Sequence, residues 1–168
     1  AMAALDQALV LEPGWLALQN IKAEILHKTG EDSEAVKQIL NTLNTAPEDP
    51  ANNLWAIQFL QQMECKDHAE KLIASSVEKF PHHLGLVLMK IENALFTGQS
   101  DPDQLVQDDL FELVQQSDDT DLLIRSAAIF ALSDNQERTV YCLEKAADHG
   151  SFTAIFDLAG LYRIRKDF

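Results

Sequence analysis

The sequence predicts an all-α fold, a solenoid of antiparallel helix hairpins with about ten helices. Three prolines, Pro13, Pro47 and Pro81, stand 34 residues apart, and alanines and large apolar residues recur at the same interval. Self-similarity at a fixed period of about 20–50 residues indicates a repeat architecture. Apolar residues also recur at helical spacing, without the alternating segments that strands show. An all-helical bundle without repeats is the alternative fold.

Prolines, glycines and capping residues divide the first half of the chain into five expected helices. They span residues 1–11, 15–28, 33–44, 51–62 and 68–79. Gly30 is placed to end the second helix, because glycine enters the left-handed conformation that closes many helices. Asp32 or Ser33 can cap the third helix. The small side chain of Ala23 should let the two helices of its hairpin approach closely.

The second half of the chain continues the same plan with one irregularity. Expected helices span residues 82–97, 103–116, 122–132, 136–148 and 151 to about 165, the last capped by Ser151. The repeat is two residues too long between the third and fourth units, and repeats near an end are often irregular.

We expect a single solenoid over residues 1–168, with units at about 1–13, 14–47, 48–81, 82–117, 118–150 and 151–168. The first and last units hold only part of a repeat. We therefore expect the chain to be a fragment of a longer protein. A solenoid offers a surface more often than a reaction centre.

The charge of the chain restricts its partners. Thirteen Lys and Arg against 27 Asp and Glu leave a net charge of −14. Such a surface disfavours nucleic acid and anionic membranes, which both require cations. It would attract a partner that is basic, or apolar with a basic rim. No apolar run approaches the ~18–20 residues of a membrane span, so we predict no membrane insertion.

The sequence carries no motif of a reaction centre. It lacks a nucleophile elbow, a phosphate-binding loop and a dinucleotide glycine pattern. Cys65 and His68 have the spacing of a metal-ligand pair, but no second pair accompanies them. Cys65 and Cys142 lie in different repeats and are not expected to form a disulfide. We predict no catalytic residue, no cofactor and no metal, and a protein that is not an enzyme.

The repeat resembles the tetratricopeptide repeat, a 34-residue helix–turn–helix unit. The resemblance rests on the second helix, with an alanine, a large apolar residue, a small residue and a proline at fixed spacing. The matching sets are Ala1, Leu5, Ala8 and Pro13; Ala35, Ile39, Thr42 and Pro47; and Ala69, Ile73, Ser76 and Pro81. The first helices mostly lack the tryptophan and the leucine–glycine pair of the family. Residues 145–162 are also similar to the related Sel-one-like repeat.

The resemblance implies a right-handed superhelix whose first helices line a concave groove that binds peptides, helices or other proteins. By the repeat register, the candidate groove residues are Asn20, Glu24, His27, Gln58, Gln61, Gln62, Glu92 and Leu95. The cation clamp of chaperone-binding members is missing, because no cation stands at the corresponding positions. We expect Trp55, Phe59, Phe96 and Phe111 in the core between repeats.

The expected function is a protein-interaction module that acts as a scaffold or adaptor. Two alternatives stay open. The chain can be a structural segment that self-associates through its end helices, at residues 1–11 and 152–162, or a regulatory arm of a multidomain enzyme.

Overall fold

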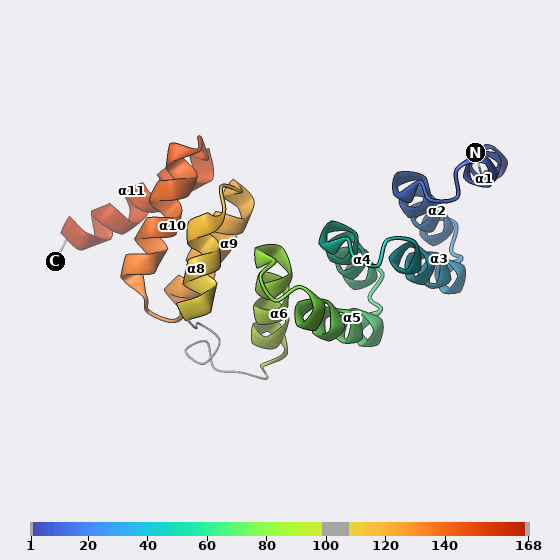
Figure 1. The fold of residues 1–168 in the computed structure, drawn as a ribbon. Coiled ribbons are helices and arrows are strands. Elements are labelled where there is room, and N and C mark those ends of the chain that lie inside the picture. The colour runs from blue at the N-terminus through green and yellow to red at the C-terminus, as the bar shows by residue number, and fades with distance from the viewer. Residues whose placement is uncertain (1, 99–107, 167–168) are drawn as a thin grey trace. The chain divides into compact units, whose positions relative to one another are not determined.

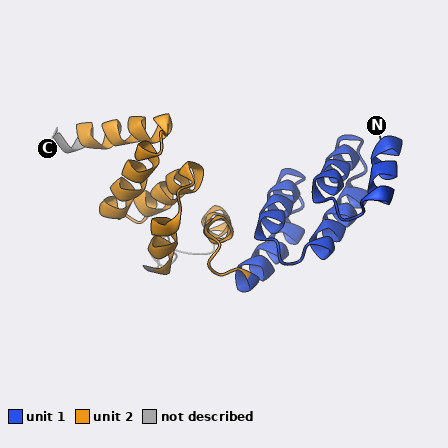
Figure 2. Ribbon diagram, turned by 45° about the horizontal axis from the view of Figure 1, so that its top comes forward, with its two compact units in different colours: residues 1–79 blue, residues 80–168 orange. Residues whose placement is uncertain are grey.

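The computed structural model describes residues 2–98 and 108–166, the side chains of residues 108 and 164–166 excepted (Figure 1). Within this part of the chain it contains ten α-helices and no strand, so the all-α prediction is confirmed. The expected helix start at residue 103 lies outside the described residues. None of the described helices is long and apolar enough to cross a membrane. The chain divides into two compact units, Ala1–Lys79 and Phe80–Phe168 (Figure 2).

The first unit consists of two helix hairpins preceded by a single helix. Its helices are α1 (Met2–Leu11), α2 (Leu16–Lys28), α3 (Asp32–Thr45), α4 (Pro50–Gln62) and α5 (Lys66–Lys79). Helix α2 packs against α3, and α4 packs against α5. Helix α1 contacts α2, and α3 contacts α4, so that each hairpin covers part of the next (Figure 1).

The helix ends of the first unit follow local chemistry. Gly30 has a φ of +80° at the end of α2, as the sequence predicts. Asp49 accepts a hydrogen bond from the backbone N–H of Ala51 at 2.9 Å and so caps α4. The prediction that Asp32 or Ser33 caps α3 is wrong. The capping position is Glu31, which makes no side-chain cap bond, because α3 begins one residue earlier than expected.

Small residues allow the helices of the first unit to pack closely. Ala23, Ala35 and Ala69 are at most 2% exposed, which confirms the predicted close approach at Ala23. Large residues such as Ile39 and Leu60 fill the space around them and are at most 1% exposed. Burying one such side chain contributes about 1.5–3 kcal/mol. The core cluster comprises Ala23, Ile39, Ala56, Phe59, Leu60 and Ala69.

Polar pairs connect the two helices of each hairpin in the first unit. The hydroxyl of Ser76 on α5 donates to Oδ1 of Asn53 on α4 at 2.9 Å, and both side chains are buried. Gln19 on α2 and Thr45 on α3 lie 3.4 Å apart between their polar side-chain atoms. Buried polar groups require such partners, since an unpaired group costs about 1–3 kcal/mol. These contacts therefore fix how each hairpin closes.

The second unit is built around a larger apolar cluster. Its helices are α6 (Leu84–Thr97), α8 (Asp108–Gln116), α9 (Thr120–Leu132), α10 (Gln136–Asp148) and α11 (Phe152–Lys166). Helix α6 contacts α8 and α9, α9 pairs with α10, and α10 contacts α11. The fully buried ring of Phe130 lies in this cluster, where the predicted core residue Phe111 contacts it edge to face at 5.9 Å.

One expected core residue of the second unit is not in the core. Phe96, near the end of α6, is 85% exposed, so the prediction of a buried ring is wrong there. The buried face of α6 runs through Leu84, Leu88 and Ile91, and Phe96 is not part of that face. Ser151 does cap α11, because its hydroxyl accepts from the N–H of Ala154 at 3.3 Å.

Candidate functional site

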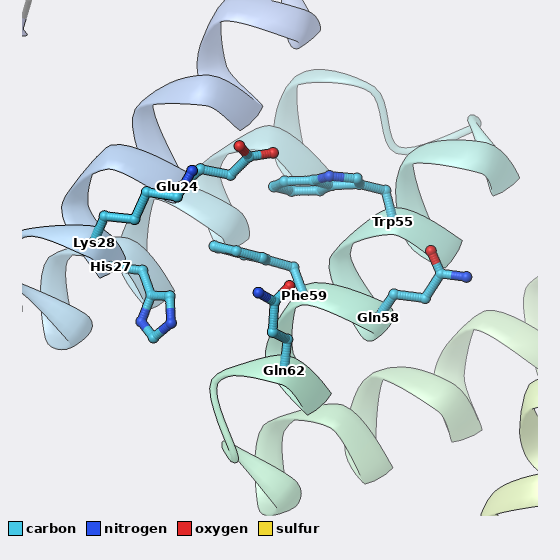
Figure 3. Close-up of a pocket in the computed structure, with 7 residues that line it drawn as sticks. All are labelled: Glu24, His27, Lys28, Trp55, Gln58, Phe59 and Gln62. Atoms are coloured by element: carbon cyan, nitrogen blue, oxygen red, sulfur yellow. The ribbon is translucent and has the colours of Figure 1, made fainter.

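A pocket of about 270 Å³ lies between α2 and α4 in the first unit (Figure 3). Both are the first helices of their hairpins. We call it the α2–α4 pocket. Its lining residues are Glu24, His27 and Lys28 from α2, and Trp55, Gln58, Phe59 and Gln62 from α4.

Helical spacing brings each set of lining residues to one face. On α2 the three residues stand at spacings of three and four, and on α4 the set Trp55, Gln58, Phe59 and Gln62 follows the same pattern. Residues three and four apart are neighbours on a helix surface. Because α2 and α4 belong to consecutive hairpins, these two faces border the same hollow.

An aromatic stack forms one side of the pocket. The rings of Trp55 and Phe59 lie nearly parallel, with an interplanar angle of 17° and 5.3 Å between their centroids. Phe59 is 6% exposed and belongs to the core, whereas Trp55 is half-buried. The expectation that both rings contribute to the core holds in part, because both also line the pocket. A flat aromatic surface of this kind accepts apolar or cationic groups.

The imidazole of His27 is held in place from two directions. Its ring meets Phe59 edge to face, with 5.8 Å between centroids and an angle of 90°. Its Nδ1 lies 2.7 Å from Oδ1 of Asp32, the first residue of α3. The carboxylate thus accepts a hydrogen bond that orients the ring. Asp32 therefore supports the pocket rather than capping its own helix.

Four flexible polar side chains surround the aromatic stack. They are the carboxylate of Glu24, the ammonium of Lys28, and the amides of Gln58 and Gln62 (Figure 3). Within the described part of the chain, these four make no hydrogen bond or ion pair. Gln58, Gln62 and Lys28 are exposed, and Glu24 is half-buried. Their donors and acceptors are available to a ligand, and amides offer both to a peptide backbone.

The pocket gathers half of the residues that the sequence predicted for a groove. Glu24, His27, Gln58 and Gln62 line it. Two other predicted residues of the same helices do not: Gln61 is exposed outside the pocket, and Asn20 is half-buried. Oδ1 of Asn20 is buried and has no hydrogen-bond partner among the described residues.

The two predicted residues of α6 belong to the second unit and have other contacts. Glu92 accepts two hydrogen bonds from Arg125, so its carboxylate is engaged within the protein. Leu95 packs against the core cluster of that unit.

Sequence reasoning missed Lys28 and did not foresee the double role of Trp55. Lys28 lies four residues after Glu24, and Trp55 lies three before Gln58. The i, i+3, i+4 rule, applied to each predicted residue, indicates both as neighbours. Its use requires knowledge of which way each helix faces. The pattern of α4 obscures this, because its buried residues include two asparagines, Asn52 and Asn53.

A second hollow, of about 400 Å³, lies in the second unit among α9, α10 and α11. Its walls are mostly apolar, with Ala127, Ala128, Leu143, Phe156 and Gly160 among them. It lacks the mixture of charges and amides seen in the α2–α4 pocket. Among the described residues, no group of three or more His, Cys, Asp or Glu is placed to hold a metal ion.

Comparison with known proteins supports the fold. No protein-family model and no curated protein matches the sequence. Among solved structures, the chain is similar to YrrB, described as a TPR protein with an unusual peptide-binding site, with 16% identity, a TM-score of 0.55, and coverage of 94% of this chain and 81% of that one. It is also similar to MamA RS-1, an ArsTM double mutant, with 16% identity, a TM-score of 0.61 and coverage of 90% and 85%.

A third structure, MamA AMB-1, has 15% identity, a TM-score of 0.51 and coverage of 86% and 85%. At such identities the likeness concerns the fold. The chain has the helical-solenoid fold of tetratricopeptide-repeat proteins, and this prediction is confirmed. The similarity of residues 145–162 to the Sel-one-like repeat stays a prediction.

Proposed function

We propose that this tetratricopeptide-repeat-like chain is a protein-interaction module that binds a peptide segment in the α2–α4 pocket. The observation that supports the proposal is the combination of an aromatic stack with four polar side chains that have no partner among the described residues. The amides of Gln58 and Gln62 would hydrogen-bond the peptide backbone, and Trp55 would contact one side chain of the peptide. A scaffold or adaptor role follows, with no reaction step required.

The preferred partner is basic, or apolar with a basic rim. The chain carries a net charge of −14, which steers cationic partners toward it. Glu24 supplies a carboxylate at the pocket itself, beside an aromatic face that attracts cations. The similarity to YrrB, whose description names a peptide-binding site, agrees with a peptide as the ligand.

The test compares two sets of variants on the same helix. A partner captured from cell extract is purified and titrated against the wild-type chain, with the fluorescence of Trp55 as readout in a Trp15→Phe background. We expect Gln58→Ala with Gln62→Ala to weaken binding roughly tenfold or more, because two hydrogen bonds of about 0.5–1.5 kcal/mol each are lost.

Gln61→Ala is the matched control, since Gln61 is exposed on α4 but lies outside the pocket. It should bind as the wild type does. Unchanged binding by the double variant, with helicity retained, would place the interaction elsewhere on the molecule. A loss of binding at high salt would show that charge takes part in recognition.

A further inference from the structure

The last helix, α11, leaves exposed a face that is buried in the first helices α2, α4 and α9. The eighth residue of α2, α4 and α9 is Ala23, Ile57 and Ala127, at most 3% exposed in each case. The eighth residue of α11 is Ala159, which is exposed. The fourth residue of each helix shows the same difference. In α2, α4 and α9 it is at most 7% exposed (Gln19, Asn53 and Leu123), whereas in α11 it is Ile155, which is 47% exposed.

The second helix of each hairpin covers this face in the other cases. Helix α3 covers it on α2, α5 on α4, and α10 on α9. Helix α11 has α10 on one side, and no helix among the described residues follows it. The structure therefore indicates a docking face for a helix of the second type, centred on Ile155 and Ala159.

The first helix, α1, has the sequence register of a second helix, the type of helix that would cover the exposed face of α11. The 34-residue period aligns it with second helices, so that Leu5 corresponds to Ile39 and Ile73, and Ala4 to Gln38 and Leu72. Helix α1 packs on the helix that follows it, as α3 packs on α4. It has no preceding first helix among the described residues. Accordingly Ala4 is exposed, whereas Gln38 and Leu72 are half-buried.

We propose that α1 of a second copy of this chain covers the open face of α11. The two helices would form an antiparallel hairpin built from two chains, and copies would associate head to tail. The α2–α4 pocket has no part in this contact, so the inference is independent of the proposed function.

The side chains at the two ends match each other in polarity. In the inner hairpins the fourth residue of the first helix meets the final turns of the second helix, in the polar pairs Gln19–Thr45 and Asn53–Ser76. In the proposed hairpin, Ile155 of α11 stands at the position of Gln19 and Asn53. By the 34-residue period, Leu11 of α1 stands at the position of Thr45, and Ala8 at the position of Ser76. Apolar residues therefore replace the polar pair on both sides of the contact.

An antiparallel arrangement also brings strongly exposed apolar residues of α1 and α11 near each other. Val10 and Leu11, at the end of α1, are 79% and 82% exposed. Phe152 and Phe156, at the start of α11, are 78% and 76% exposed. In a hairpin the end of the second helix lies beside the start of the first. The residues at the first and fifth positions of α2, α4 and α9 are half-buried, so the contact would cover part of the rings of Phe152 and Phe156, which favours association.

The two faces of this contact are different, so the association is heterologous and has no built-in closure. A single substitution at either end should block self-association, yet each variant keeps one functional face. Ala4→Arg blocks α1, and Ala159→Arg blocks α11. Both positions are exposed helical alanines, so that arginine fits without disturbing the fold of one copy.

The experiment is sedimentation velocity on the purified 168-residue chain over a wide range of concentration, with circular dichroism to verify folding. We expect the wild-type mass to rise above the 18.8 kDa of one chain as the concentration increases, and each single variant to remain at one chain. A mixture of the two variants should form a one-to-one dimer and grow no further. Ala74→Arg, at an exposed position of α5, should associate as the wild type does.

A wild-type chain that stays at the mass of one copy at all concentrations would overturn the proposal. So would a single variant that still associates, or a mixture of the two variants that stays monomeric. If Ala159→Arg loses helicity, Ile155→Lys blocks the same face through an exposed side chain and serves in its place.

Discussion

Arg125 on α9 holds Glu92 on α6 through two hydrogen bonds. Nε donates to Oε1 at 2.8 Å and Nη2 to Oε2 at 2.7 Å, the two-point geometry that favours arginine over lysine. The side chains of Arg125 and Glu92 are 20% and 36% exposed. The hydrogen bond to Glu92 is the main cause of the raised pKa of Arg125. This pair links two helices that are not consecutive in the sequence.

Glu92→Gln should lower the free energy of unfolding by about 1 kcal/mol, because the half-buried guanidinium keeps one neutral partner instead of a carboxylate. Urea unfolding followed by circular dichroism measures the change. Glu112→Gln, an exposed change on α8, serves as the control and should leave the stability as it is. Equal stability of the two variants would mean that solvent already screens the Glu92–Arg125 pair.

Ser76→Ala should destabilise the first unit by about 1–2 kcal/mol, since it leaves the buried Oδ1 of Asn53 without its donor. The double variant Asn53→Leu with Ser76→Ala should recover part of that loss, because an apolar pair needs no hydrogen bond. Leu123 is a buried leucine at the same position of α9. Thermal unfolding of the single and double variants tests this, and additive losses would contradict the explanation.

Gly30→Ala should cost about 1 kcal/mol, although there is room for the added methyl group. A Cβ at Gly30 would meet no atom within 4 Å, but the φ of +80° is unfavourable for any residue with a side chain. Gly14→Ala is the control, since Gly14 has equal room and no positive φ. Chemical denaturation of both variants separates backbone strain from packing. An equal effect at the two sites would contradict the argument.

Cys142 should make stability fall at alkaline pH. Burial raises the pKa of its thiol from 9.0 to about 12. Between these values the unfolded chain has lost the proton and the folded chain has kept it, so deprotonation favours unfolding as the pH rises. The slope from this one group approaches about 1.4 kcal/mol per pH unit above pH 9. Unfolding free energies measured from pH 8 to 11 test the direction and size of the change.

Cys142→Ala is the comparison for the alkaline measurement. The variant starts from a lower stability, because it leaves a small cavity, but its stability should fall less steeply with pH. Parallel curves for the two proteins would show that Cys142 does not cause the slope. Alkylation provides a second check: half-buried Cys65 should react in the native state, and Cys142 only on unfolding.

Helix positions could be read from the sequence because their signals are local. Proline spacing, the glycine at residue 30 and the cap at Ser151 act within a few residues of themselves, and the structure agrees with each of them. The small side chain of Ala23 also indicated a place where two helices approach closely. A cap at Asp32 was predicted wrongly, since α3 begins at Asp32 itself and Glu31 takes the capping position.

The candidate pocket was only partly predictable. The register indicated the faces of α2 and α4 that border the pocket, and therefore Glu24, His27, Gln58 and Gln62. It did not indicate that Trp55 both packs against the core and lines the pocket. The sequence pattern shows which face of the helix carries the ring, but not how deeply a neighbouring helix buries it. The same register indicated Glu92 as a groove residue, but its carboxylate accepts hydrogen bonds from Arg125, 33 residues later.

The linear order of residues thus contained the repeat length, the helix boundaries and the close-packed alanines, all of which depend on neighbours along one helix or on the adjacent hairpin. The tertiary structure decided which polar side chains form hydrogen bonds to another helix, and which have no such partner among the described residues. Among the described residues, it also left Ile155 and Ala159 of α11 exposed. These outcomes depend on which helices meet, and a side chain can be assigned to a ligand only after its contacts within the protein are known.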